Sequence, residues 1–61
     1  MNGFSIGDWL DDFMEYNDDF ICSYGYNDAV CSLEFYGADG ERYKIEVEFD
    51  DERLCAVYLT R

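Results

Sequence analysis

Apolar residues near the start of the chain recur every three or four positions, which is the spacing of one side of an α-helix. They are Ile6, Trp9, Leu10, Phe13, Met14, Phe20 and Ile21. Ser5 is a suitable N-cap, and Asp8 follows three residues later, close to a capping box. Phe4 and Trp9 occupy the two positions of a hydrophobic staple. The pattern therefore predicts a helix that starts after Ser5 and ends or frays at Asn17, which falls among the apolar positions.

From Ala29 onward the spacing changes to strict alternation, which is typical of half-buried β-strands. The first such segment places Cys31, Leu33 and Phe35 on one side. The second, the clearest in the chain, places Tyr43, Ile45, Val47 and Phe49 on one side. The third runs from Leu54 to Leu59, and we expect its inward residues to be Cys55, Val57 and Leu59. A shift of one residue would reverse that last choice of face.

Polar and glycine-rich segments separate these elements. Residues 22–28 read as a loop because Ser, Gly, Asn and Asp are concentrated there. Residues 37–40 form a turn in which Asp-Gly supplies positive φ angles, and residues 50–53 form a second short turn. The prediction is a single α+β domain, residues 1–61, with one N-terminal helix packed on a three-stranded antiparallel meander. Its expected core is Phe13, Leu33, Phe35, Ile45, Val47 and Val57.

A chain of 61 residues buries only about 60% of its unfolded surface, so it needs bulky side chains, staples or a partner. Aromatic residues make up 20% of the sequence and supply that bulk. The three cysteines, Cys22, Cys31 and Cys55, form no CxxC pair. We therefore expect three reduced thiols, no zinc site and a reducing, cytoplasmic location. No basic leader or long apolar segment points to targeting or to a membrane.

The chain lacks the residues that several kinds of catalysis and of ligand binding require. The chain has no histidine, which removes the commonest general base and metal ligand. No glycine-rich phosphate loop is present, and the acids within residues 8–19 lack the spacing of a calcium loop. Asp50, Asp51 and Glu52 offer too few ligands for calcium. The sequence therefore predicts a protein that is not an enzyme and carries no cofactor or metal.

Charge is the outstanding property of the chain. Fifteen acids against four bases give a formal charge of −11, which argues against direct binding of nucleic acid and favours a basic protein partner. On the predicted helix, one face carries acids and no base: Asp8, Asp11, Asp12, Glu15, Asp18 and Asp19. Acids four residues apart repel one another by a few tenths of a kcal/mol. This arrangement favours a functional face over one that only keeps the protein soluble.

The predicted acidic helix has a charge spacing that can be compared with DNA. Its acids span about 16 Å, or about one charge per 2.8 Å, against one per 1.7 Å of axis in duplex DNA. Tyr24 and Tyr26, beside it in the predicted loop, are candidate contact residues. A second acidic patch comprises Glu34, Glu46, Glu48, Asp50, Asp51 and Glu52, partly neutralised by Arg42 and Lys44.

In size, composition and its acidic segment Asp8–Asp19, the chain resembles the small acidic inhibitors of phages and mobile elements, such as anti-CRISPR proteins and anti-restriction DNA mimics. The resemblance implies an inhibitor that occupies the basic nucleic-acid channel of a nuclease or defence complex in the host cytosol. An antitoxin or immunity protein that blocks a basic toxin is the alternative hypothesis. A third is a homodimer that buries its spare aromatic residues, with the charge serving solubility.

Overall fold

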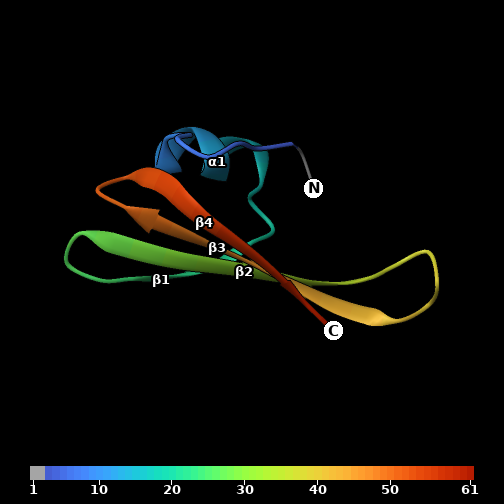
Figure 1. The fold of residues 1–61 in the computed structure, drawn as a ribbon. Helices are drawn as coiled ribbons and strands as arrows, with labels where there is room; N and C mark the ends of the chain where they lie inside the picture. Colours follow the sequence, from blue (N-terminus) through green and yellow to red (C-terminus); the bar gives the residue numbers. More distant parts are fainter. Residues whose placement is uncertain (1–2) are drawn as a thin grey trace.

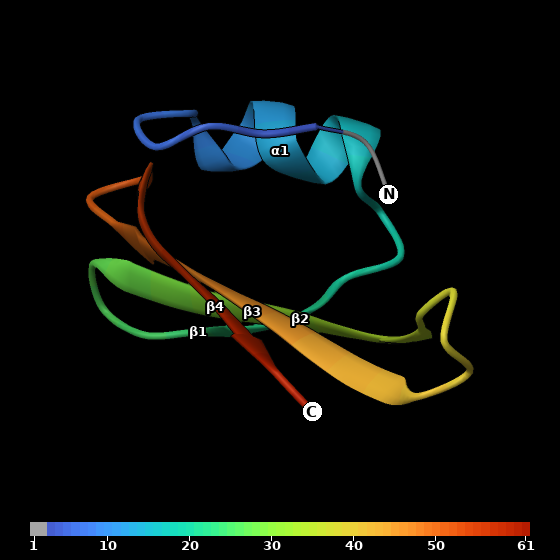
Figure 2. The same ribbon diagram turned by 45° about the vertical axis from the view of Figure 1, so that its right-hand side comes forward.

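A computed structural model describes residues 3–61 and shows one short helix above a single antiparallel sheet (Figure 1). The elements are α1 (Leu10–Tyr16), β1 (Ile21–Tyr24), β2 (Asp28–Tyr36), β3 (Arg42–Asp50) and β4 (Arg53–Thr60). The four strands pair in sequence order, β1-β2-β3-β4. The helix covers one half of one sheet face, and the β2–β3 hairpin extends beyond it (Figure 2).

The core lies between the helix and the half of the sheet beneath it. Phe13 of α1 makes edge-on ring contacts with Phe20 at 5.0 Å and with Phe49 at 5.2 Å between centroids. Below these rings the sheet contributes Ala29, Cys31, Ile45, Val47 and Leu54. The alternation of β2 and β3 therefore has the physical origin that the sequence indicated, since their inward residues meet an apolar helix surface.

The predicted fold class is wrong, because the chain is mostly β with four strands rather than three. The segment expected to be a loop contains β1, in which Cys22 and Tyr24 lie opposite Cys31 and Ala29 of β2. Only two inward positions fit within β1, so its alternation is too short to stand out from the turn residues that follow. The connection itself is limited to Gly25–Asn27.

The helix is also shorter than its apolar pattern predicted. It has seven residues, and its N-cap is Trp9 rather than Ser5. The contact expected of a capping box does form, because the N–H of Ser5 donates to the Asp8 carboxylate at 2.8 Å, but it closes a separate turn. Gly7, at φ 95°, then directs the backbone against β4. The N–H of Gly7 donates to the carbonyl of Leu54 at 2.8 Å, so this segment bonds to a strand instead of a helix.

Asn17 ends the helix, as the sequence indicated. It is the C-cap residue, and its side chain is buried. Its Nδ2 donates to the carbonyl of Phe13 at 3.2 Å, which satisfies one of the carbonyls left open in the last turn. Phe20 then reaches the core from the following turn, outside any helix.

A disulfide links Cys22 and Cys31, so the expectation of three free thiols is wrong for these two residues. They lie directly opposite each other in the β1–β2 ladder, with their Cα atoms 4.0 Å apart. Without β1 in the predicted fold, nothing in the sequence brought the two cysteines together. Cys55 is the free cysteine of the described chain and is exposed.

The expected core is correct for Phe13, Ile45 and Val47, while Leu33 and Phe35 are partly buried. The prediction that Val57 belongs to the core is wrong, because 42% of its surface is exposed. A bulge in the β3–β4 pairing places Leu54 opposite Phe49 and Val57 opposite Val47. Both residues therefore lie on the inner face, but only Leu54 lies under the helix.

Candidate functional site

The six acids predicted to share a helix face do not form a line of charge on one element. Asp11, Asp12 and Glu15 lie on α1, whereas Asp8, Asp18 and Asp19 lie in the segments that flank it. Seven helical residues span only about 10 Å. The comparison with the regular charge spacing of DNA along one helix therefore does not hold.

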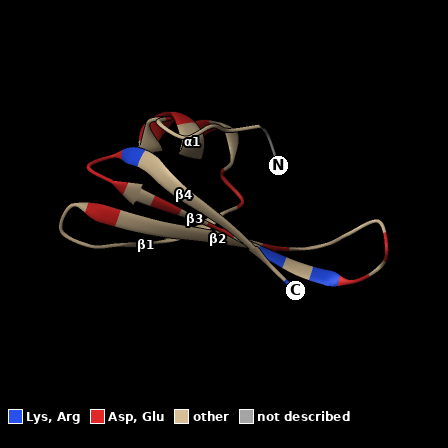
Figure 3. Cartoon of the chain, viewed as in Figure 1, with Lys and Arg blue, Asp and Glu red and all other residues tan. Residues whose placement is uncertain are grey.

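Acids from three separate segments instead converge at one end of the molecule. They come from the first turn of α1, from the start of β2 and from the β3–β4 turn. The acids of this acidic end are Asp11, Asp12, Asp28, Asp50, Asp51 and Glu52. In Figure 3 the red start of β2 and the red β3–β4 turn lie close together at the left, below the red part of the helix.

Two backbone hydrogen bonds hold these segments together. The N–H of Leu10, at the start of α1, donates to the carbonyl of Glu52 at 2.8 Å. The N–H of Asp51 donates to the carbonyl of Asn27 in the β1–β2 connection, also at 2.8 Å. The β3–β4 turn is thus attached on one side to the helix and on the other to the connection that precedes β2.

An open hollow of about 320 Å³ lies between these segments. Its walls comprise Leu10, Tyr24, Gly25, Tyr26, Asn27, Asp28, Ala29, Phe49, Asp51 and Glu52. A smaller hollow of about 180 Å³ adjoins it, sharing Leu10 and Glu52 and adding Trp9, Asp11 and Asp12. The lining of the acidic end therefore combines apolar side chains, carboxylates and tyrosines.

The backbone of the β3–β4 turn is strained. Asp51 and Glu52 have φ angles of 51° and 66°, in the left-handed region that a tight two-residue hairpin turn requires. Asn-Gly or Asp-Gly is the usual choice there, because side chains with a Cβ are disfavoured at positive φ. This turn instead places two acids at those positions.

Electrostatic repulsion adds to that strain. Asp28 and Asp50 are paired directly opposite each other in the β2–β3 ladder, and like charges at such positions destabilise a sheet. Within residues 3–61, no acid of the acidic end forms an ion pair with Lys or Arg. The fold thus keeps a group of mutually repelling carboxylates exposed and uncompensated.

The tyrosines that the sequence singled out lie at this site. Both line the larger hollow, with Tyr24 66% and Tyr26 98% exposed, so neither ring folds back onto the core. A Cβ at Gly25, between them, would overlap the Asp28 carboxylate, so a larger residue there would make that side chain turn away. Asp28 itself was not among the predicted site residues, because its neighbours in sequence form no acidic run.

The second acidic patch predicted from sequence divides into two parts. Asp50, Asp51 and Glu52 belong to the acidic end. Glu34, Glu46 and Glu48 lie on the outer sheet face, where Glu34 pairs with Arg42 and Glu46 lies 3.7 Å from Lys44. Hydrogen bonding to Glu34 raises the pKa of Arg42, which is consistent with a compensated pair.

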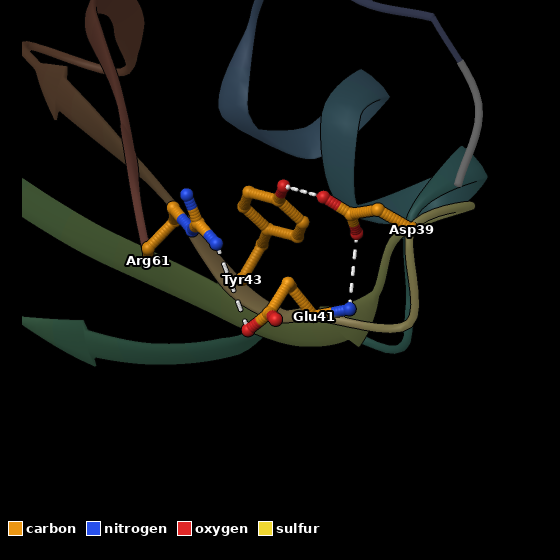
Figure 4. Close-up of polar contacts among 4 residues, drawn as sticks. All are labelled: Asp39, Glu41, Tyr43 and Arg61. Atoms are coloured by element: carbon orange, nitrogen blue, oxygen red, sulfur yellow. Dashed lines mark hydrogen bonds and ion pairs between the residues drawn. The ribbon is translucent and has the colours of Figure 1, made fainter.

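At the tip of the β2–β3 hairpin, the charged groups are also partnered (Figure 4). The Tyr43 hydroxyl donates to Asp39 at 2.5 Å, the Glu41 N–H donates to Asp39 at 3.0 Å, and Arg61 lies 3.7 Å from Glu41. The bond from Tyr43 lowers the pKa of Asp39, and the same bond raises the pKa of Tyr43. Three of the four bases thus lie on the hairpin half, and only Arg53 lies near the acidic end.

Arg53 is engaged with an aromatic ring. Its guanidinium carbon lies 3.7 Å from the centroid of the Trp9 ring, and its Nη1 donates to the carbonyl of Gly7 at 3.2 Å. The only base near the acidic end therefore supports the segment before α1 and leaves the carboxylates around the hollow unpaired.

Comparison of the chain with protein-family models, with curated proteins and with solved structures found no match. Across residues 3–61, no group of three or more potential ligand side chains is placed to hold a metal ion. The one helix in the described part of the chain is too short to cross a membrane.

Proposed function

We propose that this protein is an acidic inhibitor that binds the basic nucleic-acid-binding surface of a nuclease or defence complex. The observation that carries the proposal is the uncompensated acidic end. There, Asp28 and Asp50 face each other while Asp51 and Glu52 occupy left-handed positions. These features reduce stability, and a contact with a basic partner would offset that cost.

The hollow suits the side chains of such a partner. An Arg or Lys entering it would meet carboxylates from Asp28, Asp51 and Glu52, which accept charge-assisted hydrogen bonds. Tyr24 and Tyr26 would present ring faces to the same cation. Trp9 already makes such a contact with Arg53 within the chain. Nucleic-acid-binding channels are rich in Arg and Lys, so they provide the matching surface.

The protein would mimic nucleic acid through the clustered carboxylates of the acidic end, and not through a regular line of charges along one helix. Clustered acids raise the local negative potential, which steers a basic surface into contact and makes association sensitive to salt. The proposal places the protein in the cytosol, where disulfides are rare. The Cys22–Cys31 pair would then be reduced, and the fold would have to persist without the bridge.

The test is capture and competition. The immobilised protein is exposed to a host lysate, and bound proteins are eluted with duplex DNA in one arm and with salt in the other. We expect a nucleic-acid-binding protein that DNA elutes and whose nuclease or DNA-binding activity the inhibitor reduces. The proposal would be contradicted if duplex DNA failed to elute the captured protein. It would also be contradicted if the inhibitor left the nuclease or DNA-binding activity of that protein unchanged.

A matched pair of variants tests the site. Asp28→Asn, Asp51→Asn and Glu52→Gln together neutralise the hollow while leaving side-chain size nearly unchanged. Glu34→Gln, Glu41→Gln and Glu46→Gln remove the same charge from the hairpin half. We expect the first variant to lose most binding and the second to retain it, since only the first changes the acidic end. Equal losses would show that net charge alone governs binding.

A further inference from the structure

The outer edge of β4 is open along most of its length. The segment before α1 pairs only with the start of β4, through the bridge between Trp9 and Arg53 and the hydrogen bonds at Leu54. Within residues 3–61, no strand lies beside the remainder, residues 55–61. This open edge carries exposed Val57, Tyr58 and Leu59, at 42%, 48% and 62%. Exposed apolar edges are sites at which another strand can pair.

The composition of β4 differs from that of the other two long strands, β2 and β3, which carry acids. From Arg53 to Arg61 there are two bases and no acid, although the whole chain carries fifteen acids. Charged side chains are a common protection of sheet edges, and the interior of this edge has none. The other edge, β1, is only four residues long. The edge of β4 is thus a long sheet edge along which charge repulsion is weak.

We infer that two copies of the chain pair through β4 in antiparallel orientation, which continues each four-stranded sheet into the other. The open edge, residues 55–61, has Tyr58 at its centre, so the two-fold axis passes beside this residue. Val57 of each copy then lies opposite Leu59 of the other. Such an interface uses the same patch on both copies and closes on itself.

The distribution of charge favours the antiparallel orientation. Arg42, Lys44 and Arg61 lie on the hairpin half, near the end of β4, whereas the acidic end lies near its start (Figure 3). Antiparallel pairing sets the two acidic ends at opposite ends of the dimer, whereas parallel pairing would place them side by side. The bases of the hairpin half are already paired within their own chain with Glu34, Glu46 and Glu41, so what favours a second copy is the absence of acids along β4.

The exposed apolar side chains of β4 also favour pairing of two copies through this strand. Val57 and Leu59 lie opposite Val47 and Ile45 of β3, so they are on the inner face, beyond the part that α1 covers. Pairing of the two β4 edges would bring both residues against the corresponding pair of the other copy. This surface is separate from the acidic end, so the test of dimerisation is independent of the proposed inhibitor function.

Sedimentation measures the mass in solution. We expect the parent at roughly 100 µM to sediment at twice the chain mass of 7.2 kDa. Leu59→Lys should weaken association by at least about tenfold, because it places a charge in the apolar part of the interface. Ile21→Lys, at a residue 78% exposed on the opposite edge, is the control and should remain dimeric. A monomeric parent, or a larger effect of Ile21→Lys, would overturn the inference.

Cross-linking tests the register in chains that stay folded. In a Cys55→Ser background, Tyr58→Cys should form an intermolecular disulfide on mild oxidation, because the two-fold axis brings this position next to itself. Val30→Cys, partly exposed on the outer face of β2, should not. Failure of Tyr58→Cys to cross-link, or equal cross-linking by Val30→Cys, would overturn the β4–β4 arrangement.

Discussion

The backbone N–H of Leu10 donates to the carbonyl of Glu52 at 2.8 Å, which joins the first turn of α1 to the β3–β4 turn. A two-turn helix has little stability of its own, so this bond to the sheet fixes where it begins. The bond involves only backbone atoms of Glu52. The side chain at this position is therefore free to serve another purpose, even though its backbone conformation is unfavourable for it.

That separation gives the first prediction. Glu52→Gly should stabilise the fold by about 0.5–1 kcal/mol, because glycine adopts the positive φ angle of 66° without steric cost. The same variant should bind the basic partner more weakly, since it removes a carboxylate from both hollows. Urea unfolding and a binding titration on the same sample check the two effects. A variant that is both less stable and equally tight in binding would refute the assignment.

The second prediction concerns the aromatic core. Phe13→Ala should cost about 3–5 kcal/mol, because the ring is buried against Phe4, Phe20 and Phe49. A loss of that size approaches the whole stability of a domain this small, so the helix should detach from the sheet. Urea unfolding measures the change, with exposed Glu15→Ala on the same helix as the control. A variant that unfolds at the parent's urea midpoint would contradict the packing.

The third prediction concerns the disulfide. Denatured, unreduced protein should titrate one thiol, that of Cys55, and three after reduction. Replacing both Cys22 and Cys31 by Ser should cost about 2–3 kcal/mol, because the bridge closes a loop of about ten residues in the unfolded chain. Calorimetry of the reduced parent gives the same comparison without mutation. Three thiols before reduction would show that the bridge does not form in solution.

The fourth prediction concerns pH. Asp39 has a lowered pKa because Tyr43 and the Glu41 N–H donate to it, so its contribution to stability is present above 3.8 and is lost as pH falls through the lower folded value. Tyr43 has a raised pKa, so its contribution is present below 10.0 and is lost as pH rises through the higher folded value. Tyr43→Phe should return the Asp39 pKa toward 3.8. Carboxyl NMR titration checks this, and an unchanged value would exclude the hydrogen bond.

The fifth prediction concerns the tyrosines of the hollow. Tyr24→Ala with Tyr26→Ala should weaken partner binding and shift the melting temperature little, because both rings are largely exposed. Tyr36→Ala, exposed at the start of the hairpin connection, is the matched control and should leave binding unchanged. Unfolding of the double variant would instead assign these rings a structural role at the edge of the core.

The sequence predicted the elements whose patterns are long and self-consistent. β2 and β3 have nine residues each with clear alternation, and the connection between them contains Asp39-Gly40, of which Gly40 has a φ of 78°. The helix pattern was misleading at its start. Trp9 and Ile6 have helical spacing, but Gly7 and the bonds to Leu54 take that backbone to the sheet. A long-range strand contact of this kind overrides local periodicity.

The acidic end was harder to predict for a related reason. Asp11, Asp28 and Asp51 are far apart in sequence, and only the paired strands bring them together. The acids were selected from the sequence because they share one face of the predicted helix, and this criterion included Asp18 and Asp19 among the binding residues. The register between β2 and β3 decides instead that Asp28 faces Asp50, and that register depends on the geometry of the turn that joins the two strands.

The pairing of the segment before α1 with β4 also constrains how the chain is made. Arg53 and Gly7, which share a hydrogen bond, are 46 positions apart in the sequence. During synthesis the segment before α1 leaves the ribosome well before the strand that receives it. The β2–β3 hairpin can close as soon as it emerges, since its contacts are local. The helix must wait for β4, so the hydrophobic core is completed only after β4 has been made.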